Sequence, residues 1–152
     1  MTRLKPLADK SESEIYLTLH RVINAPVEKV YAAWTESEML RRWMAPGNAS
    51  VVRAVTDVVV GGTFLVEILG EDGRRWITCG TYLEIIPFRR LVHTWQWEGS
   101  DVETLVTIEF KQVPSGTRLT LTHSRFAKAE ARDEHVAGWN KCLTKLKDLW
   151  RE

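Results

Sequence analysis

The chain has 152 residues, with 21 Lys and Arg against 20 Asp and Glu, which gives a formal net charge of +1. Because this charge includes no basic excess that could neutralise phosphates, it argues against nucleic acid as a partner. Hydrophobic residues make up 44% and charged residues 27%, as in ordinary folded globular proteins. No apolar run approaches the roughly 20 residues that a membrane span needs, so we expect no membrane partner.

The N-terminal segment differs from the rest of the chain in its patterning. Residues 1–13 show almost no apolar periodicity, so we expect a flexible tail there and a single domain over residues 14–152. From Ile15 to Asn24, apolar and polar residues alternate, which predicts the first strand.

Two short helices are expected next. Pro26 suits the start of a helix, and apolar residues follow it at helical spacing as far as Trp34. Thr35 and Glu38 have the spacing of a capping box, in which a hydroxyl and a carboxylate satisfy each other's backbone donors. This pattern predicts a second short helix that ends before Pro46.

From Ala49 onward, turn signals separate short runs of strand-forming residues, and six strands fit between these signals. Asp72-Gly73 is the strongest hairpin signal and predicts a tight two-residue turn, in which both residues need positive φ. Short loops between successive strands predict antiparallel pairing.

The apolar period changes to alternating steps of three and four over about residues 127–151, which predicts a long amphipathic helix. The order of these elements along the chain predicts an α+β fold, with a twisted antiparallel sheet of about seven strands around a long C-terminal helix. The two short helices lie between the first and second strands.

This architecture leaves space to be filled, because one helix is too narrow to cover the whole apolar face of such a sheet. Bulky side chains or a cavity must occupy the remainder, and seven tryptophans suit either role. Alternation turns His93 and His123 inward, where each imidazole needs partners for its ring nitrogens and therefore orients a ligand or bonds backbone or water. The candidate ligand-binding residues are Trp43, Phe64, Leu91, His93, Trp95, Leu121, His123, Trp139 and Leu143.

The sequence carries no pattern typical of a metal or catalytic centre. Cys79 and Cys142 form no CxxC pair and have no histidine at metal-binding spacing, so we expect no metal and no cofactor, and a reducing, cytoplasmic location. A nucleophile elbow, a phosphate-binding loop and paired inward carboxylates are all missing, and no catalytic residue is assigned.

Seven segments also carry a family resemblance. They are RVINAPVEKV at 21–30 leading into Trp34, LRRW at 40–43, Asp57 with GGTF at 61–64, GTYLEI at 80–85, RLV at 90–92 running to Thr94-Trp95, GTRLTLTH at 116–123, and Gly138-Trp139. Together they resemble the family of homologues of the activator of heat-shock-protein-90 ATPase, in the superfamily that includes START domains and polyketide cyclases. The resemblance implies a helix-grip (START-like) fold, and functions that range over ligand sequestration, transport, cyclase chemistry and chaperone co-factor activity.

Two positions within these segments carry expectations of their own. Val59 stands where the family often has arginine in Asp-x-Arg-x-Gly-Gly, which favours a more apolar ligand or a purely structural change. Gly138 is expected to let the final helix sit close to the sheet.

The leading hypothesis is therefore a non-enzymatic module that binds a small hydrophobic or aromatic molecule, as a monomer or a homodimer. One alternative is a cyclase- or hydrolase-type enzyme that uses His93 or His123 as general acid or base. Another is a co-factor of a chaperone ATPase, which the resemblance alone suggests.

Overall fold

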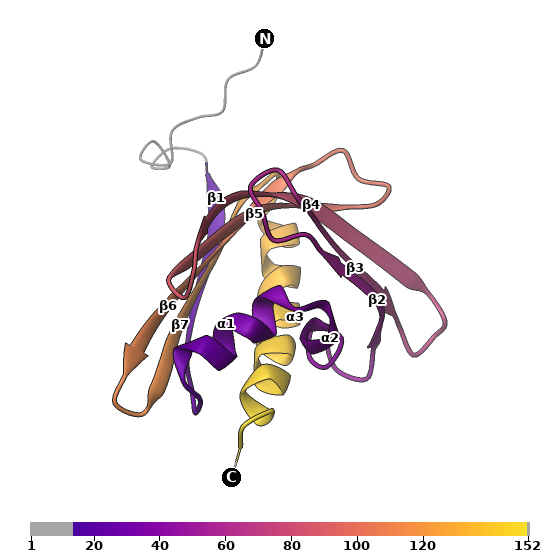
Figure 1. Ribbon diagram of the computed structural model, residues 1–152. Helices are drawn as coiled ribbons and strands as arrows, with labels where there is room; N and C mark the ends of the chain where they lie inside the picture. Colours follow the sequence, from indigo (N-terminus) through magenta and orange to yellow (C-terminus); the bar gives the residue numbers. More distant parts are fainter. Residues whose placement is uncertain (1–13, 152) are drawn as a thin grey trace.

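Within residues 14–151, which the computed structural model describes, seven strands form one curved antiparallel sheet around the long C-terminal helix (Figure 1). The tail expected over residues 1–13 lies outside this part of the chain. In chain order the elements are β1 (Ile15–Ile23), α1 (Val27–Thr35), α2 (Ser37–Leu40), β2 (Ser50–Thr56), β3 (Thr63–Leu69), β4 (Arg75–Ile86), β5 (Arg90–Trp97), β6 (Thr104–Val113), β7 (Gly116–Phe126) and α3 (Ala129–Asp148).

The strands lie in the order β1-β7-β6-β5-β4-β3-β2, and each neighbouring pair is antiparallel. Strands β2 to β7 form a continuous meander, and β1 joins its far edge by pairing with β7. The connection from β1 to β2 must therefore run from one edge of the sheet to the other. Helices α1 and α2 make this connection and cross in front of α3 (Figure 1). The helix-grip fold predicted from the sequence is confirmed.

The β3–β4 hairpin is confirmed, but its predicted two-residue turn is wrong. Leu69 pairs with Arg75, so five residues connect the strands, and the backbone N–H of Gly70 donates to the carbonyl of Arg74 at 2.8 Å. Within this loop only Gly73 takes a positive φ, of 85°. The longer loop therefore needs one left-handed residue, where the tight turn would need two.

The predicted capping box at the start of the second helix is also wrong. Thr35 is the last residue of α1, and its hydroxyl donates to the carbonyl of Tyr31 at 2.9 Å. The residue that caps α2 is Glu36, and it makes no side-chain capping bond. The hydroxyl is thus used by the helix that ends there, a competition typical of threonine near helix termini.

Tryptophans fill the interior where α1 and α2 cover α3. The Trp34 and Trp43 rings meet at 4.6 Å with an interplanar angle of 65°, and both side chains are buried. The Trp43 indole N–H donates to the carbonyl of Ala33 at 2.9 Å, which satisfies its polar group inside the core. The Trp34 ring also lies 6.0 Å from that of Trp139 on α3.

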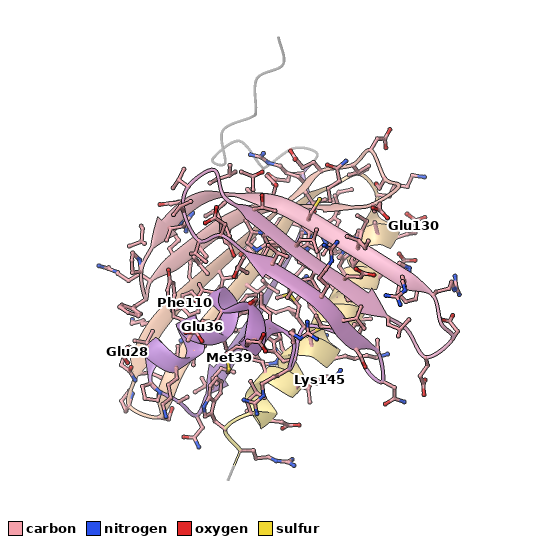
Figure 2. All side chains as sticks on the ribbon, turned by 45° about the vertical axis from the view of Figure 1, so that its right-hand side comes forward. Glu28, Glu36, Met39, Phe110, Glu130 and Lys145 are labelled. Atoms are coloured by element: carbon pink, nitrogen blue, oxygen red, sulfur yellow. The ribbon has the colours of Figure 1, made fainter. Side chains whose placement is uncertain are left out.

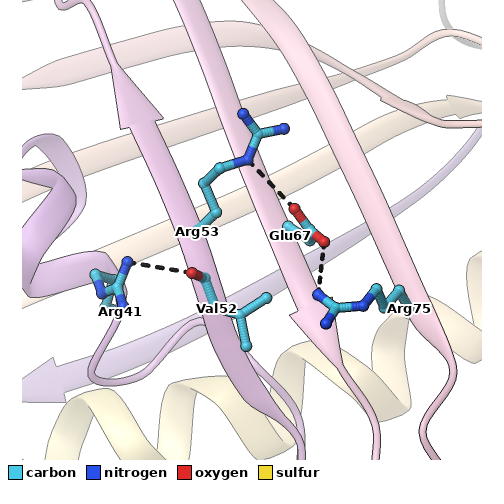
Figure 3. A network of polar contacts seen from close by, with 5 residues as sticks. All are labelled: Arg41, Val52, Arg53, Glu67 and Arg75. Atoms are coloured by element: carbon cyan, nitrogen blue, oxygen red, sulfur yellow. Dashed lines mark hydrogen bonds and ion pairs between the residues drawn. The ribbon is translucent and has the colours of Figure 1, made fainter.

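A network of polar contacts connects neighbouring strands on the outer face of the sheet (Figure 3). Glu67 on β3 accepts hydrogen bonds from Arg53 on β2 at 3.3 Å and from Arg75 on β4 at 2.8 Å. Both arginine side chains are more than half exposed, so these ion pairs add little to stability. Arg41 donates to the carbonyl of Val52 at 3.3 Å and ties the end of α2 to β2.

Strands β4 and β5 approach each other closely at Gly80. A Cβ atom added there would lie 1.8 Å from the carbonyl oxygen of Thr94, a separation that no side chain tolerates. Glycine at this position therefore permits the close approach of the two backbones. Across residues 14–151, no helix is long and apolar enough to cross a membrane.

Candidate ligand-binding site

A cavity of about 580 Å³ lies between the sheet and α3. Helix α3 forms one wall, strands β3 to β5 form another, and the connection between α2 and β2 forms the third. The lining residues are Ala131, Glu134, His135, Gly138, Trp139 and Cys142 from α3, Ile68, Trp76, Trp95 and Trp97 from the strands, and Met44, Pro46 and Ala49 from the connection.

Four indole rings line the cavity, three from the strands and one from α3. The two-residue period of β5 places Trp95 and Trp97 on one face, and their rings meet nearly at right angles at 5.6 Å. The Trp139 ring on α3 lies 5.2 Å from that of Trp95. Trp76 pairs with Ile68 across the β3–β4 hairpin and is 42% exposed, so it lies where the cavity opens to solvent.

A hydrogen bond between β5 and α3 joins two walls of the cavity. The Trp97 indole N–H donates to His135 Nε2 at 2.9 Å, and His135 Nδ1 donates to the carbonyl of Ala131 at 2.8 Å. These partners require the neutral imidazole with its proton on Nδ1. Burial lowers the pKa of His135 below its ordinary value, which favours the same neutral form.

A second chain of hydrogen bonds holds Trp139 from behind the cavity wall. The Trp139 indole N–H donates to His123 Nδ1 at 3.0 Å, and His123 Nε2 donates to the Thr104 hydroxyl at 2.7 Å. The Thr104 hydroxyl in turn donates to the carbonyl of Trp95 at 2.7 Å. Burial lowers the pKa of His123 well below its ordinary value, so this ring is neutral. The buried imidazole therefore has a partner for each nitrogen.

His93 is packed into the core in a different way. Its ring stacks on Phe64 with centroids 4.2 Å apart, and its Nδ1 donates to the carbonyl of Thr94 at 2.8 Å. Burial lowers the pKa of His93 to about 4, so the ring carries no charge at neutral pH.

The structure brings two of the nine candidate residues to the cavity, Trp95 and Trp139. The other seven are buried but do not line it, and they are Trp43, Phe64, Leu91, His93, Leu121, His123 and Leu143. All seven point inward, as alternation and helical periodicity predict. They pack against other buried side chains of the core.

Sequence reasoning missed several lining residues, and some of them had a signal. Trp97 shares the inward face of Trp95, and His135 precedes Trp139 by one helical turn. Trp76 and Glu134 had none, because both are exposed residues that reach the cavity only through tertiary packing.

Gly138 corrects an expectation. A Cβ atom added there would meet nothing within 4 Å, so this glycine does not bring α3 into contact with the sheet. It lines the cavity instead, and the missing side chain contributes to the open space. Val59 is 54% exposed and is not among the lining residues, so its replacement of arginine does not change the cavity wall.

The described residues show no metal site, since no three His, Cys, Asp or Glu side chains within 14–151 could hold an ion. Burial raises the pKa of the Cys142 thiol to about 12, so this cavity residue stays protonated.

Comparisons with known proteins agree with this architecture. A model of the family described as activator of Hsp90 ATPase homolog 1-like protein matches residues 24–151. No protein with a curated description matches the chain.

Crystal structures of bacterial proteins are similar over nearly the whole domain. One from Chromobacterium violaceum is 27% identical, with a TM-score of 0.82 over 88% of this chain and 96% of the other. One from Nitrosomonas europaea is 26% identical, with a TM-score of 0.76 over 89% and 93%. An AHSA1 protein from Silicibacter pomeroyi is 24% identical, with a TM-score of 0.79 over 88% and 96%, and shares the fold.

Proposed function

Because the chain belongs to the activator of Hsp90 ATPase homolog 1-like family and has its START-like fold, we propose that it binds a small hydrophobic or aromatic molecule between the sheet and α3, without catalysing a reaction. The cavity of about 580 Å³ with its four indole rings is the observation that carries this proposal. Its volume falls within the roughly 300–1,000 Å³ of small-molecule sites, and its mostly apolar lining is typical of them.

Two of the four indole rings are held in place by hydrogen bonds within the protein. The indole N–H groups of Trp97 and Trp139 are both held by histidines, so these rings have fixed positions. A ligand that stacks on fixed rings loses less free energy to side-chain ordering than one that must organise a flexible wall. This rigidity supports binding as the role of the cavity.

The ionisable groups of the lining favour binding over proton-transfer chemistry. Both ring nitrogens of His135 already have partners, and the Cys142 thiol is protonated. His93 and His123, the residues of the enzymatic alternative, do not line the cavity. Glu134 is the remaining ionisable side chain of the lining, and it is exposed.

The test is native mass spectrometry of freshly purified protein, followed by thermal unfolding with a panel of lipids, polyketides and aromatic metabolites. A ligand at a hundred times its dissociation constant adds about 2.7 kcal/mol to the free energy of unfolding. In a domain of this size the melting temperature should rise by several degrees.

The variant Gly138→Leu places a large side chain in the cavity and should abolish the rise. Ala137→Leu adds the same side chain at the exposed neighbouring position of α3 and should leave the rise unchanged. A rise that survives in Gly138→Leu would show that the ligand binds elsewhere, and no bound mass with no rise for any compound would refute the proposal.

A further inference from the structure

The charge distribution around the cavity points to the chemistry of its occupant. Glu134 is the one acidic side chain among the lining residues, and no lysine or arginine of residues 14–151 lines the cavity. Its side chain is exposed, so its carboxylate lies at the opening. Among residues 14–151, no hydrogen bond or ion pair engages this carboxylate, whereas Asp133 beside it pairs with Arg132 at 2.8 Å.

The four indole rings add to the same preference. The face of an aromatic ring carries negative potential, and indole is the side chain that attracts cations most strongly. Trp76 already shows this interaction, because the Arg74 guanidinium carbon lies 5.7 Å from its ring centroid. The charge of Arg74 is compensated by Asp72 at 2.9 Å, so this pair adds no net positive charge at the opening.

A positive charge lies at the opposite end of the cavity. Lys145 Nζ donates to the carbonyls of Ala45 and Ala49, and Ala49 lines the cavity. Glu134 and Lys145 are 11 residues apart on α3, which is about 16 Å along a helix axis. Figure 2 labels Lys145 and Glu130, the acidic residue one turn before Glu134, toward opposite ends of this helix.

We propose that the bound molecule is an amphiphilic cation, a hydrophobic amine or quaternary ammonium compound. Its charged group lies beside Glu134 and the indole rings, and its apolar body extends along α3 toward Ala49. This inference rests on the proposed function and specifies the ligand class for the same cavity.

The experiment compares three probes of nearly equal shape and different charge: benzyltrimethylammonium, neopentylbenzene and phenylmethanesulfonate. Each is titrated near neutral pH into isotope-labelled protein while the indole N–H signals are followed by NMR. We expect the ammonium probe to bind about tenfold more tightly than the neutral and anionic probes and to shift the signals of the lining tryptophans.

Two variants identify the groups responsible. Glu134→Gln should reduce the preference for the ammonium probe several-fold. Glu28→Gln, which changes the net charge equally from an exposed position on α1, should leave it unchanged. Trp76→Leu keeps an apolar side chain but removes an aromatic face, so it should weaken the ammonium probe more than neopentylbenzene.

The possible results distinguish failure of this inference from failure of the proposed function. Equal affinity for the ammonium and neutral probes would overturn the inference and leave hydrophobic binding intact. Tighter binding of the sulfonate would overturn it in favour of an anionic ligand. No indole shift with any probe would count against both.

Discussion

Gly138 lies in the middle of α3 and faces open space, so adding a methyl group there tests the geometry of the cavity wall directly. A Cβ atom at this position would meet nothing within 4 Å, and the backbone there is helical. The variant Gly138→Ala therefore gains helix propensity without a steric penalty.

The expected gain follows from helix propensity. Glycine in a helix interior is less favourable than alanine by about 0.8–1.0 kcal/mol. In a domain of this size, about 1 kcal/mol at the midpoint raises the melting temperature by roughly 2–4 °C. Gly138→Ala should therefore unfold a few degrees above the parent protein.

The assay is thermal and urea unfolding followed by circular dichroism, with Gly80→Ala as the opposite case. A Cβ atom at Gly80 would lie 1.8 Å from the Thr94 carbonyl oxygen, so that variant must separate β4 from β5 and should be strongly destabilised. Destabilisation of Gly138→Ala would mean that α3 packs closely at this point, and the reasoning about the cavity would fail.

Two further predictions concern the buried histidines. Burial lowers the pKa of His93 to about 4, against 6.5 for an exposed imidazole. Below pH 6.5 the unfolded chain therefore binds more protons than the folded chain. The free energy of unfolding should fall by up to about 3 kcal/mol as the pH drops from 6.5 to 4. Urea unfolding across this range should show a shallower loss in His93→Phe, and an equal loss would contradict the assignment. Thr104→Val leaves His123 Nε2–H without its acceptor and should lower the free energy of unfolding by about 1–3 kcal/mol. Thr104→Ser keeps the hydroxyl and should lower it by less. Equal stability of the two variants would argue against the hydrogen-bond chain.

Local patterns were sufficient for the architecture. The two-residue period of the strands predicted which residues of β5 and β7 point inward, including His93 and His123, and both are buried. The change to a helical period after Phe126 predicted α3. These patterns succeed because a strand or an amphipathic helix must bury one face wherever it lies.

Two local details, the partner of the Thr35 hydroxyl and the length of the β3–β4 loop, were not predicted correctly. The Thr35 hydroxyl could cap α2 or bond within α1, and both options use the same local spacing. Asp72-Gly73 fits a two-residue turn and also a five-residue loop, and the pairing of Leu69 with Arg75 selects the loop. In each case the deciding contact comes from neighbouring backbone rather than from the motif itself.

The position of the cavity was decided by tertiary packing. An inward-facing residue such as Phe64 meets another ring, His93, and becomes core, whereas Trp97 faces a helix that carries a glycine and leaves space. The binary pattern of apolar and polar residues is the same in both cases. Whether a buried side chain touches protein or lines a void depends on the volumes of residues far apart in the chain, and only the folded arrangement of β3, β5 and α3 brings those volumes together.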